Sequence, residues 1–121
     1  MKIIYYLKTC STCQRILKEL VAAGANMDSI KLVNIKTDPL TEKQVDELKA
    51  LSGSYEAIFS KKAMKYKALG LASKNLSEAD YKNYLLEDYT FLKRPVAIID
   101  QEIFIGNSKA VVTGLTKKLI N

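Results

Sequence analysis

The sequence predicts an α/β fold in which a βαβ unit and a ββα unit form a mixed four-stranded sheet, with a helical insertion between them. Three observations predict it: a β-rich run followed by a helical pattern at the start, helical patterns through the middle, and two short apolar runs before a last helix. With 121 residues, of which 48% are hydrophobic and 26% charged, the chain has the size and composition of one domain. We therefore expect a single domain over residues 1–121, with the insertion at about 40–90.

The first 36 residues form the predicted βαβ unit. Residues 2–7 (KIIYYL) are apolar and rich in strand-forming side chains. Residues 11–23 place four aliphatic side chains at helical spacing, and residues 31–35 alternate as in a short strand. The first strand-to-helix turn, which holds the cysteines, is a place where α/β folds carry functional residues.

The middle of the chain is predicted to be helical. A helix begins after Thr41, whose hydroxyl is a good N-cap, and continues to about Leu51. Two more helical patterns cover residues 60–69 and 77–86, and Ser77 opens the second with a capping-box pattern. These helices form the expected insertion.

The end of the chain reads as a ββα unit. Residues 95–99 (PVAII) and 102–105 (EIFI) are short apolar runs, and the two residues between them fit a tight hairpin. Residues 108–119 follow with the pattern of a final helix. The order of elements is therefore β, α, β, helices, β, β, α.

Cys10 and Cys13 form a CxxC pair at the first strand-to-helix turn. A structural disulfide there would close a very small loop and restrain the unfolded chain little. The chain has no histidine, which excludes Cys-His catalysis and histidine-bearing metal sites, so no metal site is expected. The alternatives to a redox pair are half of a zinc site or two inert packing thiols, and the βαβ context favours redox use.

Position on the helix gives the two cysteines different predicted roles. Cys10 faces the unpaired N–H groups of the helix start, with the cations Lys8 and Arg15 nearby, and these favour a thiolate. Cys13 lies in the first helical turn, where it can resolve a mixed disulfide formed at Cys10. The intervening Ser11 and Thr12 complete the predicted anion- or thiolate-binding loop.

Arg94 and Pro95 form a second candidate group at the start of the third predicted strand. A cis peptide bond before Pro95 would position the backbone beside the cysteine loop, and the Arg94 guanidinium would stabilise a thiolate or an oxyanion. The alternative is a surface arginine before an ordinary trans-proline. In either case Arg94 is far from the cysteines in sequence.

The formal charge of +6 would attract acidic partners, but it is also typical of a solubilising surface. The basic run at residues 61–67 (KKAMKYK) reads as a solvated helix face, and we expect no direct contact with nucleic acid. The first residues lack a signal-peptide pattern, and no apolar run approaches the roughly 20 residues of a membrane span. We therefore expect a cytoplasmic protein with no membrane attachment.

The CxxC pair, the segment 66–72 (YKALGLA), the Arg94-Pro95 step and the chain length together resemble the arsenate reductase (ArsC)/Spx family. The resemblance spans nearly the whole chain. It implies a thioredoxin-like fold with a helical insertion, and a cis-proline at Pro95 preceded by the family's arginine.

The resemblance also bears on activity. Family reductases coupled to glutaredoxin use one cysteine, matching Cys10, and three oxyanion-binding arginines. Arg94 matches one of these arginines, whereas Ser60 and Asn107 stand at the other two positions. This pattern implies weak or absent arsenate reduction.

The second cysteine, Cys13, makes the chain more similar to the Spx branch, in which CxxC is a disulfide switch. Spx regulators bind the C-terminal domain of the RNA polymerase α subunit, and a glycine matching Gly53 belongs to that contact. A helix-ending glycine is common for structural reasons alone.

The predicted function is a thiol–disulfide redox protein with Cys10 as nucleophile, Cys13 as resolving thiol and Arg94 as the stabilising cation. The alternative is an Spx-like regulator that senses oxidation, and arsenate reduction is less favoured. We expect a monomer without a cofactor that exchanges electrons with glutathione and glutaredoxin, or with thioredoxin.

Overall fold

The computed structural model describes residues 1–120, which divide into two compact units. The sheet unit comprises Met1–Asp38 and the chain from Arg94 onward, and the helical unit comprises Pro39–Lys93. The helical unit thus leaves the sheet unit after its second strand and returns before its third.

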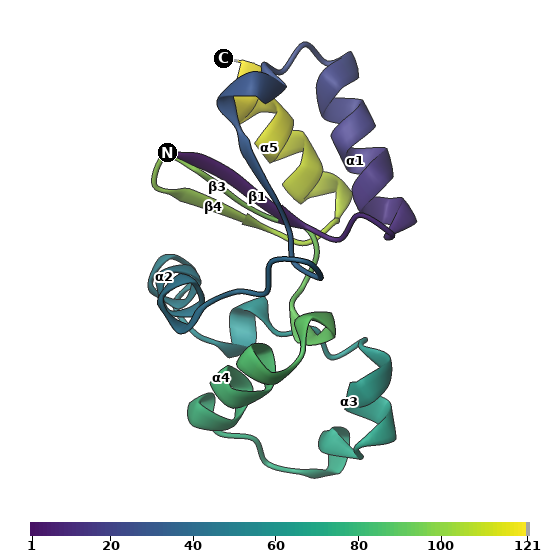
Figure 1. Cartoon of the computed structure of the whole chain (residues 1–121), viewed down its shortest axis with the longest axis vertical. Coiled ribbons are helices and arrows are strands. Elements are labelled where there is room, and N and C mark those ends of the chain that lie inside the picture. The colour runs from purple at the N-terminus through teal and green to yellow at the C-terminus, as the bar shows by residue number, and fades with distance from the viewer. Residues whose placement is uncertain (121) are drawn as a thin grey trace. The chain divides into compact units, whose positions relative to one another are not determined.

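The sheet unit contains a four-stranded mixed sheet in the order β2-β1-β3-β4 (Figure 1). Its strands are β1 (Lys2–Tyr6), β2 (Lys31–Asn34), β3 (Val96–Ile99) and β4 (Glu102–Ile105). β1 pairs in parallel with β2 and antiparallel with β3, and β3 pairs antiparallel with β4. The predicted α/β, thioredoxin-like arrangement of a βαβ and a ββα unit is confirmed.

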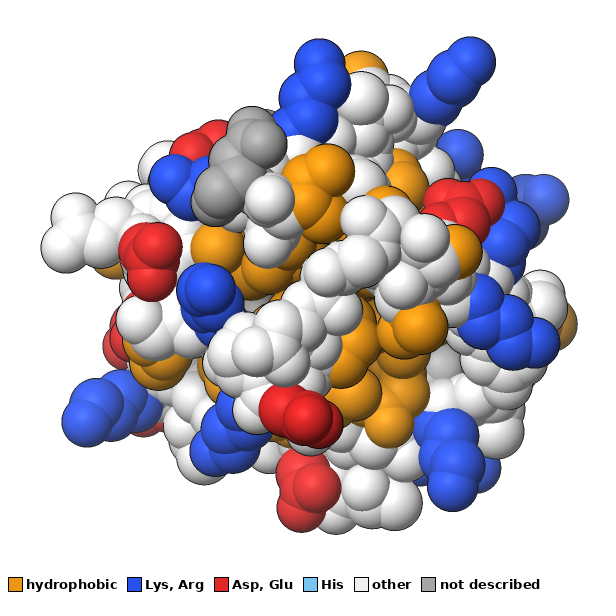
Figure 2. Space-filling model, turned by 90° about the horizontal axis from the view of Figure 1, so that it is seen from above, with side chains coloured by type: hydrophobic (Ala, Val, Ile, Leu, Met, Phe, Trp, Pro, Cys, Tyr) orange, Lys and Arg blue, Asp and Glu red, His pale blue; other side chains and the backbone are white. Residues whose placement is uncertain are grey.

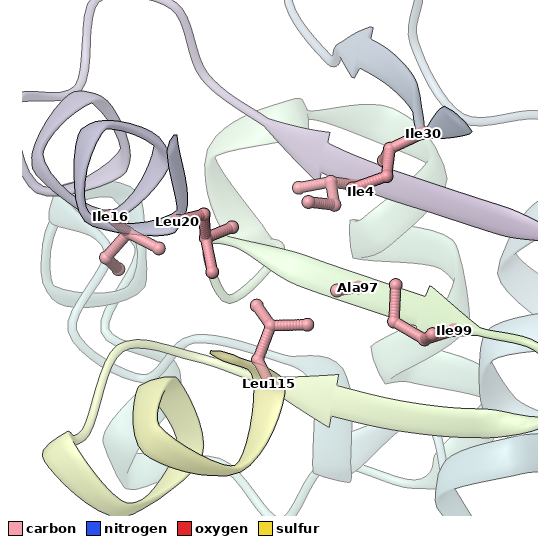
Figure 3. Close-up of a cluster of buried hydrophobic side chains, with 7 residues drawn as sticks. All are labelled: Ile4, Ile16, Leu20, Ile30, Ala97, Ile99 and Leu115. Atoms are coloured by element: carbon pink, nitrogen blue, oxygen red, sulfur yellow. The ribbon is translucent and has the colours of Figure 1, made fainter. Parts of the chain in front are cut away.

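Helices α1 (Ser11–Ala22) and α5 (Lys109–Ile120) pack on one face of this sheet (Figure 1). Strand side chains alternate between the two faces of a sheet, and helical side chains return to one face every three to four positions. Side chains from one face of the sheet and from the inner faces of both helices therefore form a shared core. Figure 3 shows the buried members of this cluster: Ile4, Ile16, Leu20, Ile30, Ala97, Ile99 and Leu115. The core fixes α1 beside β1, and with it the turn that joins them.

The hairpin between β3 and β4 forms as predicted, with Asp100 in the left-handed region at φ 60°. Aspartate tolerates this conformation better than most residues. The Asp100 N–H also donates to the carbonyl oxygen of Met1 at 2.7 Å, which ties the hairpin to the start of the chain.

The helical unit contains α2 (Glu42–Ser52), α3 (Met64–Ala68) and α4 (Glu78–Glu87). α2 and α4 each begin with a complete capping box, formed by Thr41 with Gln44 and by Ser77 with Asp80. Both boxes satisfy backbone N–H groups that a helix start otherwise leaves unpaired.

An aromatic cluster forms the core of the helical unit. Phe59 stacks on Phe91 with 5.1 Å between ring centroids and meets Tyr66 and Tyr81 edge-on at 5.9 and 4.9 Å. Offset stacked and edge-to-face pairs are the preferred aromatic arrangements.

The helix predicted over residues 60–69 is shorter in the structure, where α3 begins only at Met64. Phe59 forms an antiparallel bridge with Leu92, and the Ser60 N–H donates to the Phe91 carbonyl at 2.7 Å. Because residues 59 and 60 pair with this second segment, they are not part of a helix. The pattern of side chains could not show it, because the partner segment lies some thirty residues away in sequence.

Charged side chains are distributed around the face shown in Figure 2, with Lys and Arg interspersed with Asp and Glu and hydrophobic side chains near the centre. Within residues 1–120, no helix has the length and apolar character needed to cross a membrane.

Candidate active site

Cys10 is the N-cap residue of α1, at the end of the turn that follows β1. Its backbone is extended, at φ −84° and ψ 116°, and its carbonyl accepts the first helical hydrogen bond, from the Gln14 N–H at 3.0 Å. The Cys10 N–H donates back to the Leu7 carbonyl at 3.0 Å. The turn therefore places the Cys10 side chain at the end of α1 where backbone N–H groups lack helical partners.

The pKa of Cys10 is lowered from its usual value. Partial burial of the thiol acts in the opposite direction, but hydrogen bonds from the Cys13 backbone and thiol, then from the Thr12 backbone, together with the positive charge of Arg94, outweigh it. These groups favour the thiolate over the thiol. The lowered pKa makes Cys10 the candidate nucleophile of the pair.

Cys13 is fully buried, and burial raises the pKa of its thiol to about 11. The negative charge of a Cys10 thiolate raises it further, while the Leu7 N–H and Arg94 lower it. Both cysteines are free thiols in the structure. The pair therefore combines a partly exposed thiol of lowered pKa with a buried thiol of raised pKa.

Arg94 enters this site from the start of β3. The Arg94–Pro95 peptide bond is cis, which confirms the expectation from the sequence. The Arg94 side chain is half-buried, and its Nη1 atom is buried without a hydrogen-bond partner among residues 1–120. Its charge lowers the pKa of both cysteines, so the structure brings Arg94, Cys10 and Cys13 together as one electrostatic unit.

The backbone around Pro95 is held by the loop after β4. The Gly106 N–H donates to the Pro95 carbonyl at 2.8 Å, and the Asn107 side chain donates to the Arg94 carbonyl at 3.4 Å. Gly106 has φ 88°, a conformation that favours glycine. Asn107 therefore contacts the backbone of the site and contributes no cation to it.

The remaining predicted site residues are placed as follows. Ser11 is exposed as the first residue of α1, and Thr12 contributes its backbone N–H to Cys10. Gly53 and Ser60 belong to the helical unit. Gly53 ends α2 with a φ of 99°, a left-handed conformation that favours glycine. The end of the helix therefore explains this glycine without reference to a binding protein.

Lys8 and Arg15 were predicted to act as cations near Cys10, and the structure gives their side chains other surroundings. Arg15 forms an ion pair with Glu19 at 3.3 Å, one turn further along α1, and the Lys8 side chain is exposed. The cation identified as acting on the pKa of Cys10 is Arg94.

The sequence reasoning missed two residues that contact the turn before Cys10. The Gln14 side chain donates to the Lys8 carbonyl at 2.6 Å, and the Lys8 N–H donates to the Asn34 side chain at 3.3 Å. No motif marks either residue. Asn34 comes close to the turn only because β2 pairs beside β1.

In a comparison with protein families, the model of the ArsC family matches residues 5–115, almost the whole chain. Comparison with curated proteins gives no match.

Solved structures similar to this chain carry related descriptions. A "possible arsenate reductase" from Streptococcus mutans UA159 is 26% identical, with a TM-score of 0.74 over 95% of this chain and 97% of that one. An ArsC family related protein from Bacteroides fragilis is 24% identical, with a TM-score of 0.75 over 94% and 96%. An arsenate reductase from Vibrio cholerae is 18% identical, with a TM-score of 0.75 over 94% of each chain. The latter two comparisons establish likeness of fold.

Proposed function

The chain belongs to the ArsC family, and from this premise we propose that it is a thiol–disulfide oxidoreductase that uses Cys10 and Cys13. The observation that carries the proposal is the contrast within the pair. Cys10 is partly exposed with a lowered pKa, whereas Cys13 is fully buried with a pKa of about 11. An attacking thiolate and a protected second thiol are what a two-step exchange requires.

The reaction begins when the Cys10 thiolate attacks one sulfur of a substrate disulfide. A bond forms between Cys10 Sγ and that sulfur, the substrate S–S bond breaks, and the other substrate sulfur leaves as a thiolate. Cys13 then loses its proton and attacks Cys10 Sγ, which releases the second substrate thiolate. The substrate gains two electrons, and the protein is left with a Cys10–Cys13 disulfide.

Arg94 serves this chemistry as a positive charge that favours the thiolate form of Cys10. A forked guanidinium can also donate charge-assisted hydrogen bonds to an anion. The unpartnered Nη1 atom supports this role, because a buried N–H group without a protein acceptor is costly unless an anion compensates it.

Turnover requires a thiol reductant that returns two electrons to the Cys10–Cys13 disulfide. We assign this role to glutathione with glutaredoxin, or to thioredoxin, and so place the protein in the cytoplasm, where such thiols are kept reduced. The catalytic partner is therefore another thiol redox protein, and no bound cofactor is needed.

A chromogenic aromatic disulfide tests the two-step scheme, because each attack releases one coloured thiolate. The wild-type protein should release two thiolates per chain and end with an internal disulfide. Cys13→Ser should release one and retain the aromatic thiol as an adduct on Cys10, visible as a mass increase, and Cys10→Ser should react slowly. If Cys13→Ser reacts as slowly as Cys10→Ser, Cys10 is not the attacking residue.

Arsenate reduction is the less favoured activity. A doubly charged oxyanion needs several charge-assisted donors, and Ser60 and Asn107 bind backbone groups where the family's reductases carry arginines. A coupled assay with glutathione and glutaredoxin should therefore give little turnover. The double variant Ser60→Arg and Asn107→Arg is the matched gain-of-function control, and turnover by the unmodified chain at the level of an ordinary reductase would contradict this assignment.

A redox-sensing regulator of the Spx type is the second candidate. Cys13 provides the second thiol of a disulfide switch, and Gly53 is exposed, with no other heavy atom near the position of a Cβ. The test is capture of the C-terminal domain of the RNA polymerase α subunit by the reduced and the oxidised protein. Gly53→Arg should abolish capture, whereas Gly24→Arg, at an exposed glycine with a similar φ of 95°, should not. No capture in either redox state would exclude this candidate.

A further inference from the structure

Both backbone polar groups of Lys8, two positions before Cys10, are bound by side chains. The Lys8 N–H donates to Asn34 Oδ1 at 3.3 Å, and the Lys8 carbonyl accepts from Gln14 Nε2 at 2.6 Å. The two side chains come from different elements, the end of β2 and the first turn of α1. They therefore hold the turn from two sides.

Asn34 is carried on a fixed part of the sheet. It lies opposite Tyr6 in the parallel β1–β2 register, and the Ile35 N–H donates to the Tyr6 carbonyl at 2.9 Å. The Asn34 carbonyl accepts from the Asp38 N–H at 2.9 Å and from the Thr37 hydroxyl at 3.2 Å. The Asn34 side-chain amide that accepts from Lys8 therefore belongs to a residue whose backbone is fixed by hydrogen bonds to β1 and to the following turn.

Gln14 is bound to the cysteine turn through both its backbone and its side chain. Its backbone N–H donates to the Cys10 carbonyl, while its side chain reaches back to the Lys8 carbonyl. The Cys10 N–H closes the turn onto Leu7. Gln14 consequently connects the start of α1 to the residues on the N-terminal side of the nucleophile.

We infer that Asn34 and Gln14 are positioning residues of the Cys10 site, which act by fixing the Lys8 peptide. The inference rests on the proposed function for its biological meaning, but the contacts on which it depends are independent of any substrate. The Lys8 side chain is exposed, so water competes for its peptide groups. Without the two amides the turn would sample other conformations, and Cys10 would align less well with the N–H groups at the start of α1.

The polarity of the two contacts provides a matched test. The Lys8 N–H needs an acceptor, which Asn34→Asp preserves, whereas the Lys8 carbonyl needs a donor, which Gln14→Glu removes when the carboxyl is ionised. Both variants add one negative charge close to the same turn. Asn34→Leu and Gln14→Met remove the contacts at similar side-chain size without adding charge.

The measurement is the pH profile of Cys10 alkylation by iodoacetamide, with the labelled residue located by mass spectrometry. Gln14→Met and Asn34→Leu should shift the profile to higher pH, with alkylation several-fold slower at neutral pH and the same plateau at high pH. Asn34→Asp should shift the profile less than Gln14→Glu. An effect of charge alone would shift the two equally.

Folding is monitored in the same samples, since Cys13 is fully buried and becomes labelled only when the sheet unit opens. If Gln14→Met or Asn34→Leu fails to fold, the comparison of Asn34→Asp with Gln14→Glu decides by itself. Equal shifts in that pair, or unchanged profiles in folded Gln14→Met and Asn34→Leu, overturn the inference. Alkylation requires no turnover, so failure of the proposed reductase activity would be seen separately, in the disulfide assay.

Discussion

Cys10 and Cys13 lie three positions apart, yet burial affects their pKa values very differently. At Cys13 burial is the largest influence and raises the pKa to about 11. At Cys10 the backbone N–H groups of α1 and the charge of Arg94 prevail over it. The two cysteines of a short sequence motif thus have pKa values shifted in opposite directions.

The first prediction concerns selective labelling of these thiols. At neutral pH iodoacetamide should modify Cys10 several-fold faster than it modifies a free cysteine, because a thiolate forms above the thiol's pKa and the pKa of Cys10 is lowered. Cys13 should remain unlabelled in the folded protein, because it is fully buried and its pKa is raised to about 11. Mass spectrometry after timed labelling measures both sites, and equal rates at the two cysteines would contradict the assignment.

The second prediction concerns Arg94. Replacing it with methionine removes the charge and keeps much of the side chain's apolar length, so the pKa of Cys10 should rise and alkylation at neutral pH should slow several-fold. Arg15→Met is the matched control, because Arg15 pairs with Glu19 on the exposed side of α1. Equal slowing in the two variants would show that the effect is general electrostatics rather than a specific site.

At the scale of elements, the paired caps of α2 and α4 give the third prediction. Thr41→Ala and Ser77→Ala should each lower the free energy of unfolding by about 1 kcal/mol, since each leaves an N–H group of the first turn without its side-chain acceptor. Thr113→Ala, at an exposed position within α5, makes the same chemical change away from a cap. Denaturant unfolding should show a lower free energy of unfolding in the two cap variants and no decrease in the control.

The fourth prediction concerns Gly114 in the middle of α5. A Cβ there would lie 3.4 Å from Phe104 Cε1, an ordinary packing distance. Gly114→Ala should therefore stabilise the protein by about 0.5–1 kcal/mol, because alanine loses less backbone entropy in a helix. The same change at Gly106, where φ is 88°, should destabilise instead. A lower unfolding midpoint for Gly114→Ala would mean that Phe104 cannot adjust.

The elements that the sequence predicted well are those determined by local patterns. β1, α1, β2 and the β3–β4 hairpin follow from periodicity and turn residues, and their ends differ from the prediction by one residue at most. The early start expected for α3 was wrong because a bridge between Phe59 and Leu92 overrides the local pattern.

The same distinction holds for the site. The cysteines and the cis Arg94–Pro95 step carry sequence signals, and the structure places them in one unit. Gln14 and Asn34 carry none, because their contacts with Lys8 depend on the pairing of β1 with β2 and on one side-chain conformation in α1. Both contacts are made to backbone atoms of Lys8, which any residue except proline would offer, so the identity of residue 8 does not reveal them.

At the scale of the whole molecule, acid should destabilise the fold mainly through the helical unit, which is the fifth prediction. Its carboxyl groups with lowered pKa are Asp46, Glu56, Asp80 and Asp88, the last at about 2. A group whose pKa is lower in the folded state stabilises it above the unfolded-state pKa, and that stability is lost as pH falls through the folded value. Unfolding free energy should therefore decline between the usual carboxyl pKa of about 4 and about 2.

Asp88→Asn provides the control for this prediction. Burial raises the pKa of Asp88, but contacts with Lys65 and Thr90 lower it by more. The variant should be less stable at neutral pH and should lose less stability on acidification than the wild type. Identical acid profiles for the two proteins, measured by denaturant unfolding at several pH values, would contradict the assignment.

The unpartnered Nη1 atom of Arg94 also has a consequence for the reduction potential of the cysteine pair. When Cys10 is a thiolate, its negative charge compensates the half-buried Arg94 guanidinium, and the proposed Cys10–Cys13 disulfide would remove that charge. The proposed disulfide would therefore lack whatever free energy the cation contributes to the thiolate, and it would be a stronger oxidant for that reason. Each pKa unit by which a cation favours a thiolate corresponds to about 1.4 kcal/mol, or about 30 mV for a two-electron couple. By the same thermodynamic cycle, the reduced protein gains the corresponding resistance to unfolding.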